Sequence, residues 1–166
     1  MPKKPLVAII MGSDSDLPIM SEASKALDAE KIPYEVKILS AHRSPIEAAK
    51  FAKSARSKGF KVIIAGAGGA AHLAGVVASL TTLPVIGVPM ETKELKGIDS
   101  LFSIVQMPSG IPVATVTIGK TGARNAAILA TQILSLADKK LEKGLDALKR
   151  TLVEGVRKKN AGLKRG

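Results

Sequence analysis

The sequence predicts an α/β fold in which a parallel sheet lies between two layers of helices. Continuous apolar runs recur along the chain, as at residues 6–11 and 62–67, and each has the length of a strand buried on both faces. Stretches with helical periodicity separate these runs. Strands that alternate with helices at this spacing are typical of parallel sheets covered on both sides.

Five strands can be assigned in order, at residues 6–11, 34–39, 61–67, 84–88 and 113–118. Helices are expected at residues 18–30, at 45–58, after the Gly-rich segment 66–71 as far as residue 80, and at 98–105. Helical character resumes at residue 123 and continues to about 159, with a break expected near Gly144. We therefore expect residues 1–166 to form a single domain, a three-layer αβα sandwich of flavodoxin-like or Rossmann-like type with a long C-terminal helix.

Composition narrows the class of protein. Hydrophobic residues make up 46% of the chain but aromatic residues only 2%, so Ala, Val, Ile and Leu must build the core. The absence of cysteine excludes disulfides and thiolate metal sites. The apolar run after the basic N-terminus is too short for a secretory signal, and nowhere do 18 apolar residues follow one another. We expect a soluble cytoplasmic protein without a membrane span.

The net charge of +11 raises the question of nucleic-acid binding, but most of it lies at one end of the chain. Residues 139–166 hold ten Lys or Arg and three acidic residues, a net charge of +7. Because the chain has few aromatic side chains for base stacking, we interpret residues 142–166 as a basic, solvated helix and tail and expect no nucleic-acid partner.

The helix expected from residue 123 to 136 is apolar nearly all round. A helix without a polar face is buried on more than one side. In so small a domain this pattern predicts a subunit interface, and a closed symmetric homo-oligomer is the usual form.

Polar residues follow the second predicted strand. Ser40, Ala41, His42 and Arg43 lead into a helix start at Ser44, which has Pro at the first helical position and Glu three residues on. Histidine can carry protons near neutral pH, and arginine suits phosphate. The carboxyl edge of a parallel sheet is where ligands bind, so this position favours function over the more common structural role of a lone histidine.

The segment Gly-Ser-Asp-Ser-Asp at residues 12–16 joins the first strand to the first helix. Backbone N–H groups and the hydroxyls of Ser13 and Ser15 at a helix start form a natural phosphate site, and Asp16 could bind ribose hydroxyls. The same segment could equally be a turn with Asp16 as helix N-cap.

The Gly-rich segment 66–71 follows the third strand and matches a loose dinucleotide-binding pattern, with Glu91 twenty residues further on. That fingerprint normally belongs to the first strand–helix unit, and this loop could instead offer backbone amides to a small anion. His72 is either a second functional histidine or a residue of the helix start. Gly119-Lys120-Thr121 lacks the first glycine of a phosphate-binding P-loop, and no spacing of His, Asp or Glu predicts a metal site.

Several of these motifs, in the same order, resemble those of the N5-carboxyaminoimidazole ribonucleotide mutases of purine biosynthesis. The likeness runs from about residue 6 to residue 137. Its motifs are G-S-D-S-D at 12–16, S-A-H-R-S-P at 40–45, A-G-A-G-G-A-A-H-L at 65–73, D-S-L-F-S-I-V-Q-M-P at 99–108 and N-A-A at 125–127.

The resemblance implies a proton-carrying His42, a substrate phosphate bound by Ser13, Ser15 and Arg43, and a ribose held by Asp16. It further places around the imidazole and the migrating carboxylate a set of groups from two loops: Ser40, Ala41, Ala67, Gly68, His72 and Leu73. It implies no metal and no cofactor, a homo-octamer, and an ATP-dependent carboxyaminoimidazole ribonucleotide synthase as the enzyme that acts before this one.

Enzymes of this family fall into two classes. Arg43 and the G-G-A-A-H sequence at residues 68–72 are similar to the mutase class, whereas the class that carboxylates aminoimidazole ribonucleotide directly with CO₂ tends to have Lys after the histidine. Leu17 and Ala74 depart from the Trp and Pro that the mutases often have there. The alternatives are direct carboxylation and a non-catalytic nucleotide-binding module that uses the Gly66 loop and Glu91.

Overall fold

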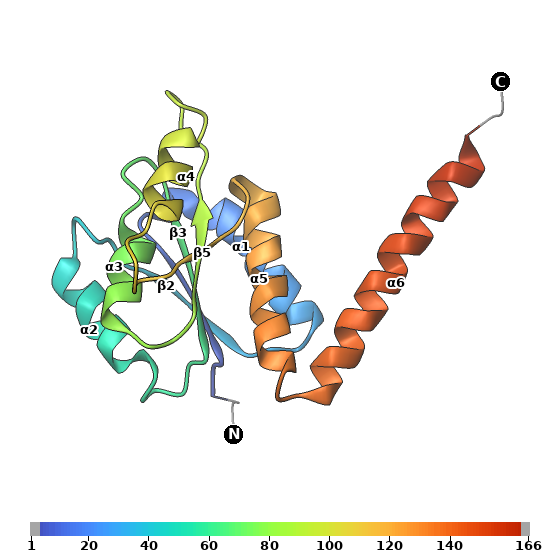
Figure 1. Ribbon diagram of the computed structural model, residues 1–166, viewed down its shortest axis with the longest axis horizontal. Helices are drawn as coiled ribbons and strands as arrows, with labels where there is room; N and C mark the ends of the chain where they lie inside the picture. Colours follow the sequence, from blue (N-terminus) through green and yellow to red (C-terminus); the bar gives the residue numbers. More distant parts are fainter. Residues whose placement is uncertain (1–3, 164–166) are drawn as a thin grey trace.

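The computed structural model describes residues 4–163, which form a five-stranded parallel sheet in the order β2-β1-β3-β4-β5 with helices on both faces (Figure 1). The strands are β1 (Val7–Met11), β2 (Tyr34–Ile38), β3 (Val62–Ala67), β4 (Val85–Pro89) and β5 (Ala114–Thr115). The helices are the short 3₁₀ helix η1 (Asp14–Asp16), then α1 (Leu17–Ala29), α2 (Pro45–Ala55), α3 (Leu73–Leu80), α4 (Ile98–Val105), α5 (Gly119–Ser135) and α6 (Lys139–Gly162). The predicted three-layer fold is confirmed, and the strand order is the flavodoxin-like one.

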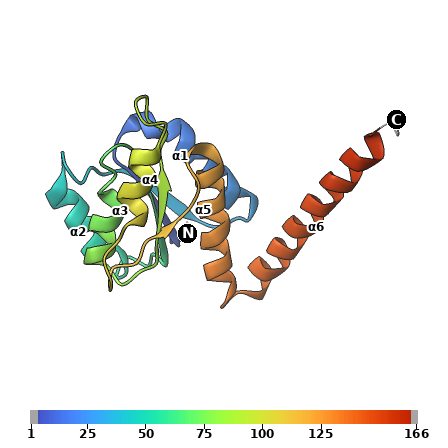
Figure 2. The same cartoon turned by 45° about the horizontal axis from the view of Figure 1, so that its top comes forward.

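Alternate residues of the central strands divide the core into two layers. On β1, Val7, Ile9 and Met11 pack towards α1 and α5, while Ala8 and Ile10 pack towards α2 and α3. Side chains that alternate between faces are a property of any strand, and here both faces are apolar because helices cover both. Figure 2 shows the sheet between these two helical layers.

The parallel register brings the ends of three strands to the same level. Met11 of β1 lies opposite Ile38 of β2 and opposite Gly66 of β3. The loops that follow these three strands therefore begin side by side, at the switch point between β1 and β3.

The fifth strand is shorter than the predicted span of residues 113–118. Only Ala114 and Thr115 pair with β4, opposite Ile86 and Gly87, and Val116 N–H adds one bond to Gly87 O. In a parallel ladder the next β4 residue turned towards β5 is Pro89, which has no N–H to donate. The ladder ends there, although the sequence remains apolar.

The helical break lies at residues 136–138 and not near Gly144, so that prediction was wrong. Asp138 is the N-cap of α6, and its carboxylate accepts a hydrogen bond of 2.8 Å from Lys140 N–H. Gly144 lies inside α6, where a Cβ would collide with the carboxylate of Glu30. Because that carboxylate is the end of a flexible side chain that can move aside, the packing does not by itself require glycine at this position.

Helix α6 leaves the rest of the molecule after its first turns and projects away from it in both views (Figures 1 and 2). Leu141 is buried, whereas Leu152, Val153 and Val156 are half or more exposed. Across residues 4–163, no helix combines the length and the apolar character needed to cross a membrane.

Substitution of Gly87 by Ala tests the packing beneath α4. A Cβ at Gly87 would overlap Ile104 Cγ2 and would lie 3.0 Å from Val113 Cγ1, and both neighbours are held in the core. We expect the variant to lose about 1–3 kcal/mol of unfolding free energy in urea denaturation, the usual cost of overpacking. In Gly155→Ala the added Cβ meets open space in α6, so this control should unfold at the wild-type urea concentration or above it.

Candidate active site

A cavity of about 410 Å³ lies at the carboxyl ends of β1, β2 and β3. Every residue predicted for the site lines it, together with Gly12 and Ala70. The predicted residues at the cavity are Ser13, Ser15, Asp16, Ser40, Ala41, His42, Arg43, Ala67, Gly68, His72 and Leu73. Residues far apart in the sequence are thus brought together, while what each of them binds remains a prediction.

The first loop is folded by its own side chains. Ser13 is the N-cap of η1, and its hydroxyl accepts from Ser15 N–H at 3.3 Å while it donates to Asp14 Oδ1 at 3.1 Å. Asp16 occupies the N-cap position of α1, but its side chain makes no capping bond. Its carboxylate is therefore not used as a cap and lies at the cavity.

The Asp16 carboxyl is partly withdrawn from water. Burial raises its pKa above the ordinary value of 3.8, and the opposing effects of Ser13, Ser15 and Arg43 are smaller. An acidic group held at a desolvated position without a capping role is typical of a binding site.

The second loop is a tight turn built around Ser40. The Ser40 hydroxyl accepts from the N–H groups of His42 at 3.3 Å and Arg43 at 3.0 Å. Ser44, predicted as a helix N-cap, occupies that position, but its hydroxyl makes no capping bond. Instead it accepts from Ser40 N–H at 3.0 Å and donates to Ser40 O at 3.2 Å. The two serines thus fix the turn that presents His42 and Arg43.

Two long-range hydrogen bonds join this turn to its neighbours. Arg43 Nη2 donates to Gly12 O at 2.5 Å, which ties the second loop to the first. His42 Nε2 and His72 Nδ1 are 2.8 Å apart and share a hydrogen bond, with the rings edge to face. Sequence reasoning missed both bonds, since no local pattern tells which loops will touch.

The third loop turns sharply between β3 and α3. Ala71 N–H bonds to Gly69 O and His72 N–H to Ala70 O, each at 2.8 Å. Gly69 has a φ of +65°, in the left-handed region that favours glycine. His72 takes the N-cap position of α3 without a side-chain capping bond, which leaves its ring free to meet His42.

The alternative nucleotide-binding arrangement lacks one of its parts. Glu91 is exposed beyond the end of β4 and does not line the cavity with the Gly66 loop. Within residues 4–163, no three His, Asp or Glu side chains gather as they would around a metal ion.

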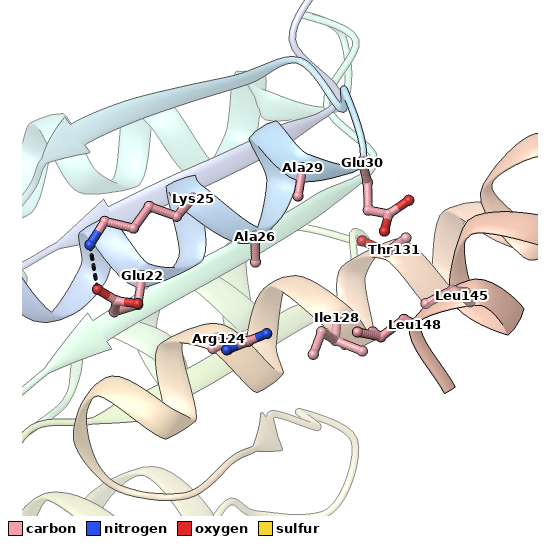
Figure 3. Close-up of a pocket in the computed structure, with 10 residues that line it drawn as sticks. All are labelled: Glu22, Lys25, Ala26, Ala29, Glu30, Arg124, Ile128, Thr131, Leu145 and Leu148. Carbon is pink, nitrogen blue, oxygen red and sulfur yellow. Dashed lines mark hydrogen bonds and ion pairs between the residues drawn. The ribbon is translucent and has the colours of Figure 1, made fainter. Parts of the chain in front are cut away.

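A second hollow of about 290 Å³ lies between α1, α5 and the first half of α6 (Figure 3). Leu145 and Leu148 of α6 line it with Ile128 of α5, and the Glu22–Lys25 ion pair lies at its edge. It is remote from the strand ends, and its lining carries neither histidine. The cavity at the strand ends is therefore the candidate active site.

The arrangement suits an anionic, partly planar ligand. Hydroxyls, the N-terminal turn of η1 and Arg43 gather on one side, where a phosphate could be bound. On the other side, two imidazoles and the backbone of a glycine-rich loop offer a proton carrier beside hydrogen-bond donors.

Comparison with known proteins finds relatives that match most of the chain. The N5-carboxyaminoimidazole ribonucleotide mutase of Pyrococcus horikoshii is 56% identical over 160 residues, covering 94% of this chain and 89% of that protein. The mutase of Bacillus subtilis is 59% identical over 143 residues, 86% of this chain and 88% of that protein. The crystal structure of Treponema denticola PurE matches with a TM-score of 0.87 at 29% identity, over 97% of this chain and 99% of that one. The family described as AIR carboxylase matches residues 6–154, and the chain belongs to that family.

Proposed function

We propose that this protein is an isomerase that converts N5-carboxyaminoimidazole ribonucleotide to 4-carboxyaminoimidazole ribonucleotide in purine biosynthesis. The observation that carries the proposal is the turn at residues 40–44, which places His42 and Arg43 at one cavity and bonds each to a different loop. The mutases of Pyrococcus horikoshii and Bacillus subtilis, which are 56% and 59% identical to this chain, support the same activity.

Substrate binding divides between the two sides of the cavity. Ser13, Ser15 and Arg43 bind the phosphate, and Asp16 accepts hydrogen bonds from the ribose hydroxyls. The Arg43 guanidinium donates one hydrogen bond to Gly12 O, and its other N–H groups can donate to the phosphate oxygens. Ser40, Ala41, Ala67, Gly68, His72 and Leu73 surround the imidazole and its carboxylate.

The chemistry needs one proton that is given and then taken back. Protonated His42 donates to the nitrogen that carries the carboxylate, the C–N bond breaks, and CO₂ and the free amine result. C4 of the electron-rich imidazole then attacks CO₂, and neutral His42 removes the proton from C4. His42 ends as it began, so the carboxylate moves without net proton transfer.

His72 has a supporting role in this scheme. Its Nδ1 shares a hydrogen bond of 2.8 Å with His42 Nε2, which limits rotation of the His42 ring and fixes the tautomer of each imidazole relative to the other. A ring whose rotation is limited needs less rearrangement to give a proton and then to take one back.

The direct carboxylase remains the second candidate. Arg43 after the histidine and the sequence at residues 68–72 favour the mutase class, as does the similarity to the two mutases. The substrate, an unstable carbamate, would come from an ATP-dependent carboxyaminoimidazole ribonucleotide synthase. Substrate and product are charged nucleotides that do not cross membranes unaided, so we place the reaction in the cytoplasm.

We also propose that the protein is a homo-octamer. Exposed Leu152, Val153 and Val156 on projecting α6 and the hollow between α1 and α5 provide apolar surface for a second copy to cover. Closed symmetric assemblies are the usual outcome of such self-association.

The central test is the conversion of N5-carboxyaminoimidazole ribonucleotide by the purified protein without ATP, metal or bicarbonate. We expect turnover by wild type, and a loss of kcat of about 10²–10⁴-fold in His42→Asn, because the proton carrier is gone. Binding of aminoimidazole ribonucleotide by the variant should persist. If wild type uses aminoimidazole ribonucleotide with CO₂ and not the carbamate, the chain is the direct carboxylase. A near-normal rate in His42→Asn would show that His42 is not the proton carrier.

Asp16→Asn should separate binding from stability. Burial raises the pKa of Asp16, which means that its ionised form destabilises the folded state. This cost is absent below about pH 3.8, where Asp16 is protonated in both the folded and the unfolded state. It grows as the pH rises from 3.8 through the raised pKa of the folded state. The variant should therefore melt higher than wild type at pH 7, with the difference shrinking towards pH 3.8.

The same variant should raise KM about tenfold or more, because a hydrogen bond between ribose and a charged group is lost. Asp146→Asn, an exposed position on α6, is the control and should change neither quantity. An Asp16→Asn protein with unchanged KM would exclude the ribose contact.

Light scattering tests the assembly. We expect a mass about eight times the 17.2 kDa of one chain for wild type. Val156→Glu should give smaller species, whereas Lys158→Glu, which changes a charged and exposed position on the opposite face of the same helix, should keep the wild-type mass. A monomeric wild type would contradict the proposal.

A further inference from the structure

Helix α4 holds the third loop of the cavity from outside. Gly69 N–H donates to Ser100 Oγ at 2.9 Å, and Ser103 Oγ lies 3.2 Å from Gly69 O and 2.7 Å from Asp99 O. The N–H and the carbonyl of Gly69 thus each lie beside a serine hydroxyl, and the two serines are one helical turn apart on α4. None of these hydroxyls lines the cavity.

Ser100 is an unusual residue in this core. Its side chain is fully buried, and within residues 4–163 the only other buried polar side chain is that of Thr131. A buried hydroxyl is tolerated only when it is hydrogen-bonded, and the Ser100 hydroxyl accepts its hydrogen bond from Gly69 N–H of the loop. An apolar residue would suit the position better if α4 had only to pack.

The helix that carries these serines is itself anchored. Ile104 is buried against Gly87 of β4. At the other end, Thr92 Oγ1 donates to Asp99 Oδ1 at 2.8 Å and accepts from Gly97 N–H at 3.1 Å. The loop is thus bonded to a helix that is itself anchored near both of its ends.

The fixed residue lies where the loop is most easily distorted. Gly69 has a φ of +65° and can move readily to other conformations, and its carbonyl also accepts the N–H of Ala71. His72 follows Ala71 in the same loop, and its ring bonds to His42. A shift at Gly69 would therefore displace both the loop amides and the partner of the proton carrier.

We propose that Ser100, assisted by Ser103, is a positioning residue of the reaction: it holds the Gly66–Leu73 loop in the conformation that places its backbone and His72 around the migrating carboxylate. This inference rests on the function proposed above. The phosphate and ribose contacts belong to the first and second loops, so loss of Ser100 should affect the reacting end of the substrate and leave the other end intact.

Ser100→Ala tests the inference, because the variant should have a lower kcat while its affinity for the substrate stays nearly the same. We expect kcat for N5-carboxyaminoimidazole ribonucleotide to fall about tenfold or more, because small misplacements of reacting groups are costly. KM and the Kd of aminoimidazole ribonucleotide, which lacks the carboxylate, should change by less than about twofold, since uniform binding is retained. Ser103→Ala should give a smaller effect in the same direction.

Thr131→Val is the matched control. It removes the other buried hydroxyl, which donates to Ala127 O at 2.8 Å within α5, away from the cavity. Because Thr131 borders the hollow between α1 and α5, light scattering should first confirm that this variant keeps the wild-type mass. Both variants should lose thermal stability, but only Ser100→Ala should lose kcat. If kcat is unchanged in Ser100→Ala, or falls equally in Thr131→Val, the positioning role is wrong.

Hydrogen exchange of the free protein separates this inference from the proposed function. Peptides that cover residues 66–73 should exchange faster in Ser100→Ala than in wild type or Thr131→Val, whether or not the substrate is correct. Unchanged exchange would overturn the fastening of the loop even in an active enzyme. If exchange is faster in Ser100→Ala but wild type does not turn over the carbamate, the hydrogen bond to the loop is supported and only the proposed reaction is wrong.

Discussion

The site depends on the register of three parallel strands. Because Met11, Ile38 and Gly66 lie opposite one another, the chain leaves β1, β2 and β3 at the same height. Each strand is held by backbone hydrogen bonds and by side chains buried on both faces, so this edge cannot shift without breaking the core. The three loops inherit their starting points from that edge, and the cavity exists because those points are adjacent.

Each loop is first folded locally and then bonded to its neighbours. Serine hydroxyls fold the loops after β1 and β2, and the buried Ser100 holds the loop after β3. Arg43 and His42 then join the three loops through Gly12 O and His72. The exposed polar groups of the cavity are thereby held in place before a ligand arrives, which reduces the cost of ordering them on binding.

Two regions of the molecule differ in their composition. The cavity gathers hydroxyls, imidazoles and one arginine at the strand ends, whereas the excess positive charge of the chain lies mainly on α6, which projects away from the rest of the molecule (Figure 1). Net charge thus says little about the ligand of the cavity. Apolar residues along the projecting helix and the hollow at its base lie outside the cavity.

The sequence by itself determined the fold class, the order of elements and the three polar segments of the cavity. Apolar periodicity reports burial directly, and polar residues that follow buried strands must lie at one edge of a parallel sheet. It could not place the helical break at Asp138, because glycine is tolerated inside a helix and Gly144 alone does not tell whether the chain turns there. Nor could it show that Ser44 bonds to Ser40, that His72 meets His42, or that Ser100 holds Gly69. These are pairings between groups with several possible partners, and only the packed tertiary structure decides which partner is within reach.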